Sequence, residues 1–182
     1  MKSHFKTALL CTSLTALLAC VATNKNIVAN TVVDKSVPSL EATYGTWKVF
    51  TVDQSDKKVC YVSSNPVETN GNHHNHRDPY VMVAFFGNGK QEVSISAGYT
   101  YKMKSVVAVS IDGQQERFIA ENENIAWAEK IGSDKQIIKK MLQAGKLMVF
   151  SESNIGTYAV DVYSLANFKE ALARAASLCK DN

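Results

Sequence analysis

The sequence predicts a mainly β domain, a β-sandwich of antiparallel strands with two packed α-helices. Short runs in which apolar and polar side chains alternate recur roughly every 8 to 14 residues, and turn-forming residues separate them. Two longer segments instead place apolar residues three and four positions apart, which is typical of a helix with one buried face. The 182 residues are 46% hydrophobic and 20% charged, a composition that suits one globular core.

The alternating runs define the expected strands in chain order. Residues 47–52 and 59–63 form a first hairpin, and residues 146–151 and 157–163 form a last one. Asp112-Gly113 is the sharpest turn signal, because a two-residue hairpin loop needs residues that accept a positive φ. Five further strands are expected between the two hairpins, at 80–86, 92–99, 106–111, 117–121 and 125–129.

Two helices are expected among these strands. The first begins with the capping-box pattern from Ser133 to Gln136, and Gly145 stands where a left-handed C-terminal residue belongs. The second helix begins at the cap candidate Ser164 and ends near Cys179. Its apolar stripe consists of Leu165, Phe168, Leu172, Ala175, Ala176 and Cys179.

The amino terminus has the pattern of a bacterial secretory signal peptide over residues 1–19. Lys2 and Lys6 precede an uncharged, Leu- and Ala-rich run of about 15 residues, which is shorter than the roughly 20 that a spanning helix needs. Residues 20–40 are polar and lack periodicity, so we expect a flexible tether there and the folded domain over 41–182.

The cleavage site decides whether the mature protein is anchored. The stretch from Leu17 to Cys20 resembles the lipobox of bacterial lipoproteins, in which cleavage before the cysteine leaves Cys20 as a lipid-bearing amino terminus. Ordinary cleavage after Ala22 or Ala29 is the alternative. In both cases we expect export, either to the periplasm or to a lipid-anchored position in the envelope, with the outer membrane favoured.

The cysteines divide by position. Cys11 lies in the signal and Cys20 is either lipidated or lost, which leaves Cys60 and Cys179 as the natural disulfide pair of an exported domain. A redox or nucleophilic thiol is the alternative, but the chain lacks a Cys-x-x-Cys spacing.

One loop concentrates possible metal ligands. Imidazoles at close spacing can bind Zn, Cu or Ni, particularly beside a carboxylate. We favour a solvated loop over a metal site, because the run lies in a polar segment between strands, and we expect no cofactor. The residues concerned are His73, His74, His76 and Asp78.

Nucleic-acid binding and catalysis have little support. The net charge of +3 is small and evenly spread, whereas nucleic-acid binders carry a clustered basic face. The chain has no Gly-x-Ser-x-Gly elbow and no phosphate-binding glycine loop. We therefore expect no enzyme, although carboxylates such as Glu121, Glu123 and Asp161 could meet in space. Most aromatic side chains are expected in the core, with an exposed subset left for a partner.

Short motifs follow one another along the chain in a recognisable order: Tyr44–Val49, Val59–Pro66, Arg77–Val83, Ser96–Tyr99, Ala126–Ala128, Ala144-Gly145, Asp161–Leu165, Phe168 and Cys179. This ordered set resembles the invasion associated locus B protein family of α-proteobacteria. The departures are Asn167, where the family often has Gly, and the His-rich run.

This resemblance implies a secreted or envelope-associated β-sandwich and carries over no catalytic residue. We therefore expect a non-enzymatic envelope protein that binds a protein or an envelope component and contributes to host-cell invasion or host interaction. The membrane contact would be the lipid on Cys20, and the alternative is a periplasmic metal-binding protein that uses His73, His74 and His76.

Overall fold

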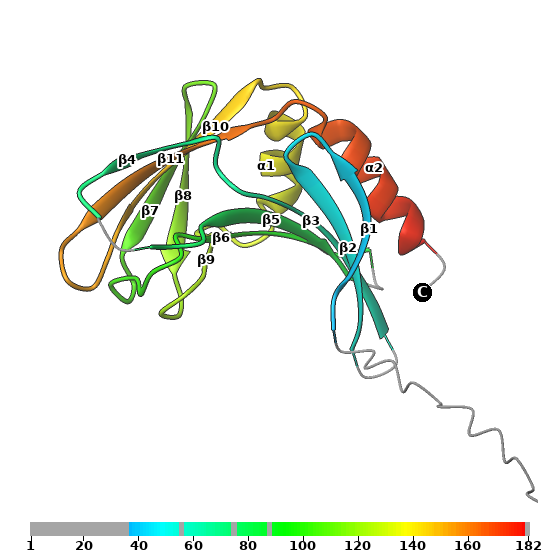
Figure 1. Cartoon of the computed structure of the whole chain (residues 1–182), viewed down its shortest axis with the longest axis horizontal. Coiled ribbons are helices and arrows are strands. Elements are labelled where there is room, and N and C mark those ends of the chain that lie inside the picture. The colour runs from blue at the N-terminus through cyan, green and yellow to red at the C-terminus, as the bar shows by residue number, and fades with distance from the viewer. Residues whose placement is uncertain (1–36, 55–56, 74–75, 87–88, 181–182) are drawn as a thin grey trace, which may run out of the picture. The chain divides into compact units, whose positions relative to one another are not determined.

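The computed structural model describes residues 37–54, 57–73, 76–86 and 89–180. In this part of the chain, strands form one antiparallel sheet in the order β1-β2-β3-β5-β6-β9-β8-β7-β10-β11-β4, accompanied by two helices (Figure 1). The strands are β1 (Ser39–Tyr44), β2 (Trp47–Gln54), β3 (Lys57–Ser64), β4 (Glu68–Gly71), β5 (Tyr80–Phe85), β6 (Gln91–Ser96), β7 (Val106–Ile111), β8 (Gln114–Ala120), β9 (Ala126–Ala128), β10 (Lys146–Glu152) and β11 (Tyr158–Ser164). The helices are α1 (Asp134–Met141) and α2 (Phe168–Leu178).

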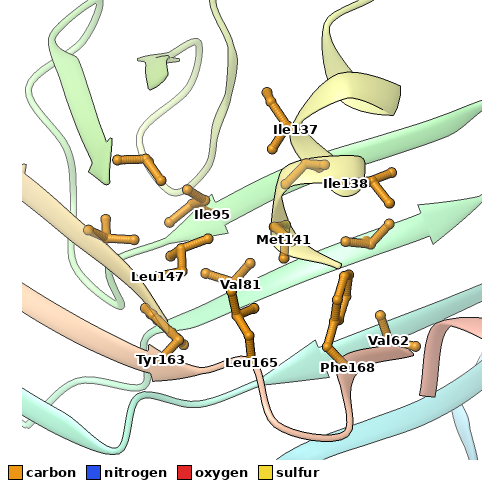
Figure 2. Packing of buried hydrophobic residues seen from close by; sticks show 14 of the residues in the cluster. Val62, Val81, Ile95, Ile137, Ile138, Met141, Leu147, Tyr163, Leu165 and Phe168 are labelled. Atoms are coloured by element: carbon orange, nitrogen blue, oxygen red, sulfur yellow. The ribbon is translucent and has the colours of Figure 1, made fainter. Parts of the chain in front are cut away.

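The two halves of this sheet share one core. Inward side chains of β2, β3, β5 and β6 belong to the same buried cluster as those of β7, β10 and β11. Figure 2 shows how this cluster joins Val81 of β5 and Leu147 of β10 to Met141 of α1 and Phe168 at the start of α2. The prediction of a mainly β, sandwich-like antiparallel fold with two packed helices is confirmed.

The helices pack on the half of the sheet that contains β1, β2, β3, β5 and β6. α1 buries Ile137, Ile138 and Met141 and contacts β6. α2 contacts β1, β2, β3 and β5, where the ring of Phe168 lies 4.7 Å from that of Trp47. Trp47 is fully buried, and its indole N–H donates to the carbonyl of Ser164, which satisfies the polar end of the ring.

The predicted helix caps are partly wrong. Ser133 precedes α1, but its hydroxyl donates to the carbonyl of Lys130 instead of accepting from the first turn. Gly145 is not in the left-handed conformation predicted for it, and its N–H donates to the carboxylate of Asp112. α2 begins at Phe168 and not at Ser164, because β11 continues through Ser164.

Asn167 explains the later start of α2. Its φ is +62°, a left-handed conformation that Asn tolerates better than most residues and Gly accepts without cost. The Gly-to-Asn departure from the resembling family therefore preserves the backbone requirement at this position.

Two edge strands were missed by the sequence analysis. β1 starts at Ser39, where a tether was expected, and β4 occupies a segment expected to be a polar loop. All four β4 residues are exposed, so no alternation marks the strand; its pairing with β11 creates it. The Asp112-Gly113 hairpin is confirmed, with φ values of +44° and +88°. Within the described residues, no helix is long and apolar enough to cross a membrane.

Candidate functional site

The disulfide prediction is confirmed. Cys60 of β3 and Cys179 after α2 are bonded, with their Cα atoms 6.0 Å apart. The bond ties the last helix to the sheet across 119 positions of sequence. It occupies both cysteines that the structure describes, so neither serves as a thiol there. Cys20, the predicted lipid attachment site, lies outside the described residues.

The His-rich loop lies beside a cleft of about 460 Å³. His73, His76 and Asp78 all line this cleft, whereas His74 lies outside the described residues. The Nδ1 atom of His73 is 2.7 Å from the hydroxyl of Thr157, and its ring packs 4.6 Å from the ring of Tyr99. His73 is thus held against Tyr99 and against Thr157, which directly precedes β11.

A metal centre is not assembled in the part of the chain that the structure describes. No group of three or more His, Cys, Asp or Glu side chains suited to a metal ion occurs there. Asp78, one of the candidate ligands, accepts a hydrogen bond from the side-chain amide of Asn65 at 2.9 Å. The metal-binding hypothesis stays a prediction that depends on His74.

A buried ion pair joins Arg77, which lines the same cleft, to Asp161 of β11. Arg77 donates to both carboxylate oxygens of Asp161, at 2.7 and 2.5 Å, and also to the carbonyl of Ala97 at 3.1 Å. The two side chains are 6% and 1% exposed. Thr69 of β4 adds a third donor to the carboxylate at 2.9 Å. The carboxylate of Asp161 is therefore well supplied with donors.

The ion pair keeps Arg77 charged. The hydrogen bond from Arg77 to Asp161 raises the pKa of the guanidinium, so the cation persists at all ordinary pH values. Tyr99 packs beside Arg77, shares a 2.7 Å hydrogen bond with Ser151, and has a pKa raised by burial. Because the two charges neutralise each other, the arrangement suits a structural clamp that joins the loop, β4 and β11.

Sequence reasoning missed this pairing although it named Asp161 as a carboxylate. The available signal was position: Asp161 lies between Ala159 and Tyr163 on the buried side of an alternating strand. An acid at an inward position predicts a buried cation, but only the fold shows which one, because Arg77 is 84 positions away.

The other two candidate acids, Glu121 and Glu123, do not join Asp161. Glu121 forms an exposed ion pair with Lys104, whereas Asp161 is engaged by Arg77. Glu123 uses its backbone carbonyl to accept from Tyr101. The structure describes no shared contact among these three acids.

The half of the sheet that contains β7, β10 and β11 presents an apolar face to solvent. Inward positions of β7, β10 and β11 are buried, as alternation requires, but the outward positions are also mostly apolar. Phe150 is 47% exposed and Tyr158 is 41% exposed, with their rings 5.9 Å apart. We define the outer apolar face as Val106, Ala108, Met148, Phe150, Tyr158, Val160 and Val162.

Strand register makes this face continuous. Phe150 of β10 lies opposite Ala108 of β7 and Val160 of β11, so these three form one row across the sheet. Met148 and Val162 are paired in the next row. The rim is polar, with Glu68 and Asn70 on β4 at one side and Arg117 on β8 at the other. An apolar centre with a polar rim is typical of a protein interaction surface.

These observations define a disulfide-linked antiparallel β domain with one exposed apolar sheet face. The chain belongs to the invasion associated locus B (IalB) protein family, whose model matches residues 47–176. This confirms the family resemblance seen in the sequence.

A solved structure supports the fold. Invasion associated protein b from Bartonella henselae superposes with a TM-score of 0.56 at 17% identity, over 78% of this chain and 99% of that one. At this identity the likeness concerns the fold alone. A comparison with curated proteins finds no match.

Proposed function

We propose that this chain is a non-enzymatic, exported envelope protein that binds another protein through its outer apolar face. The observation that carries the proposal is the exposure of Phe150, Tyr158 and their apolar neighbours on a sheet face that would be polar if it always met water. The family and the Bartonella henselae protein are named for invasion. We therefore propose that this chain contributes to host interaction by binding its partner.

The size of the face suits a protein partner. Three strands about 4.8 Å apart and three rows of outward residues about 6.7 Å apart cover on the order of 300 Å², and the polar rim on β8 and β4 brings the surface to on the order of 500 Å². Two such surfaces together give about 1,000 Å², the lower limit for a specific interface. Two adjacent aromatic side chains at its centre are the residue type that dominates binding energy.

Photo-crosslinking tests the surface. Benzoylphenylalanine placed at position 150 should yield one discrete adduct in cells, and Tyr158→Glu in the same chain should abolish it by placing a charge in the desolvated centre. The matched control is the same amino acid at Met103, which is 50% exposed in a loop outside this face. Absence of an adduct, or equal adducts from both positions, would contradict the proposal.

The exported and non-enzymatic parts have their own tests. Mass spectrometry of the mature protein from its envelope fraction reports the cleavage site and any lipid on Cys20 together. Intact cytosolic protein would contradict export. Turnover in a broad hydrolase screen that is lost on substitution of an exposed acid such as Glu121 would contradict the non-enzymatic assignment.

A further inference from the structure

The two ends of β10 carry opposite charges on the outer side of the sheet. Lys146 begins this strand and Glu152 ends it, and both side chains are exposed. They lie on the same side of the strand as Met148 and Phe150, because positions two apart share one face. No ion pair joins Lys146 or Glu152 to an opposite charge among the residues that the structure describes. The central strand of the outer apolar face thus ends in a cation on one side and an anion on the other.

These side chains are placed symmetrically about the middle of β10. Val149 is three residues from each charge, so each lies about 10 Å from it along the strand. Met148 and Phe150 lie one residue to either side of the same point. Consider a twofold axis that lies over the sheet and crosses β10 at right angles at Val149. Rotation about this axis exchanges the level of Lys146 with that of Glu152.

We propose that the outer apolar face binds the same face of a second copy of this chain, with the two β10 strands antiparallel across this twofold axis. Lys146 of each copy then faces Glu152 of the other, as the reciprocal contacts of a twofold interface require. The ring of Phe150 lies against the thioether of Met148, which is a favourable contact. The inference rests on the proposed function, because it names the partner of that same surface.

The charges select this orientation over its alternative. A twofold axis that runs along β10 would also join the two apolar faces, but it would place like charges together at both ends of the strand. The axis across the strand creates two pairs of opposite charge instead. Sheets packed face to face lie about 10 Å apart, a distance that an extended lysine and an extended glutamate side chain span together.

The size of the interface predicts a reversible dimer. Each copy contributes on the order of 500 Å², so the dimer buries about 1,000 Å² in total, near the lower limit for a specific interface. We expect a dissociation constant of about 1 to 100 μM, measured by sedimentation velocity. Phe150→Glu should leave the protein monomeric at about 100 μM, because it places a charge in the desolvated centre. Phe150 is 47% exposed, so an unchanged urea midpoint shows that this variant folds.

Charge exchange tests the orientation. Lys146→Glu and Glu152→Lys should each raise the dissociation constant about tenfold, because each replaces two attractive pairs with two repulsive ones. The double variant Lys146→Glu/Glu152→Lys restores opposite charges and should dimerise within about threefold of the wild-type constant. The matched control is Lys102→Glu, an exposed lysine outside the face, which should dimerise as the wild type does. A monomeric wild type at about 100 μM, or a double variant no tighter than the single ones, would overturn the inference.

The mass of the photo-crosslinked adduct separates this inference from the proposed function. Benzoylphenylalanine at position 150 should give an adduct of two identical chains, joined at Met148 of the second copy. An adduct with a different protein would uphold the proposed function and overturn the dimer. No adduct, or a link within a single chain, would contradict both.

Discussion

Removing the cation of the buried Arg77–Asp161 pair should destabilise the domain strongly. Arg77→Met takes away two donors from a carboxylate that is only 1% exposed and leaves it the hydroxyl of Thr69. Breaking a buried pair by removing one partner costs about 3–5 kcal/mol, because an uncompensated charge stays out of water. The same change frees the carbonyl of Ala97.

Urea unfolding measured by fluorescence gives the size of this loss. With a slope of about 2 kcal/mol per molar, a loss of about 4 kcal/mol lowers the midpoint by about 2 M. The double variant Arg77→Met/Asp161→Leu removes both charges, so we expect it to be more stable than the single variant by about 2 kcal/mol or more.

The matched control is Arg117→Met, which breaks the exposed pair between Arg117 and Glu129. Water screens this pair, so its loss should leave the urea midpoint within experimental error of the wild-type value. A single variant at Arg77 that loses less than about 1 kcal/mol, or a double variant less stable than the single one, would refute the reasoning.

Three further results are expected. Cys60→Ala/Cys179→Ala should lose about 5 kcal/mol in the same urea assay, since the bond closes 119 positions of chain; a loss below about 1 kcal/mol would contradict this. Gly98→Ala should cost at least about 1 kcal/mol more than Gly113→Ala: both have positive φ, but a Cβ at Gly98 would lie 2.5 Å from the backbone nitrogen of Asp78, whereas Gly113 is open, and equal losses would show that the contact relaxes. The free energy of unfolding should hold below about pH 10 and fall above it, because the unfolded chain releases tyrosine protons that the fold retains. An absorbance titration checks the cause, since burial raises the pKa values of Tyr61, Tyr80, Tyr99, Tyr101 and Tyr163. Ionisation of all five hydroxyl groups at about pH 10 without unfolding would contradict it.

Local patterns predicted most strands because the polarity of each side chain indicates whether it is buried. In β2, Trp47 and Val49 alternate with partly exposed neighbours, so the period of two is visible without the fold. β4 shows no such alternation, because its backbone pairs with β11 while all its side chains are exposed to water. The start of α2 was misplaced because Ser164 could equally cap a helix or end a strand, and the pairing of Ser164 with Lys146 decided it.

The candidate sites were less predictable than the strands. The sequence pointed to the His loop, where the described residues assemble no metal group, and it passed over Phe150 entirely. A strand with apolar residues on both faces looks in sequence like a fully buried strand. Only the position of β10 in the sheet shows that one of its faces has no covering layer among the described residues.

The sequence by itself determined the antiparallel β class, the two helices, the Cys60–Cys179 bond and the family, because alternation, helical spacing and cysteine count are local or countable properties. The tertiary structure decided that Arg77 neutralises Asp161 and that the outer apolar face meets solvent. Each of these depends on residues far apart in the chain. A pattern encodes whether a side chain prefers burial, whereas the fold alone selects the atoms that lie against it.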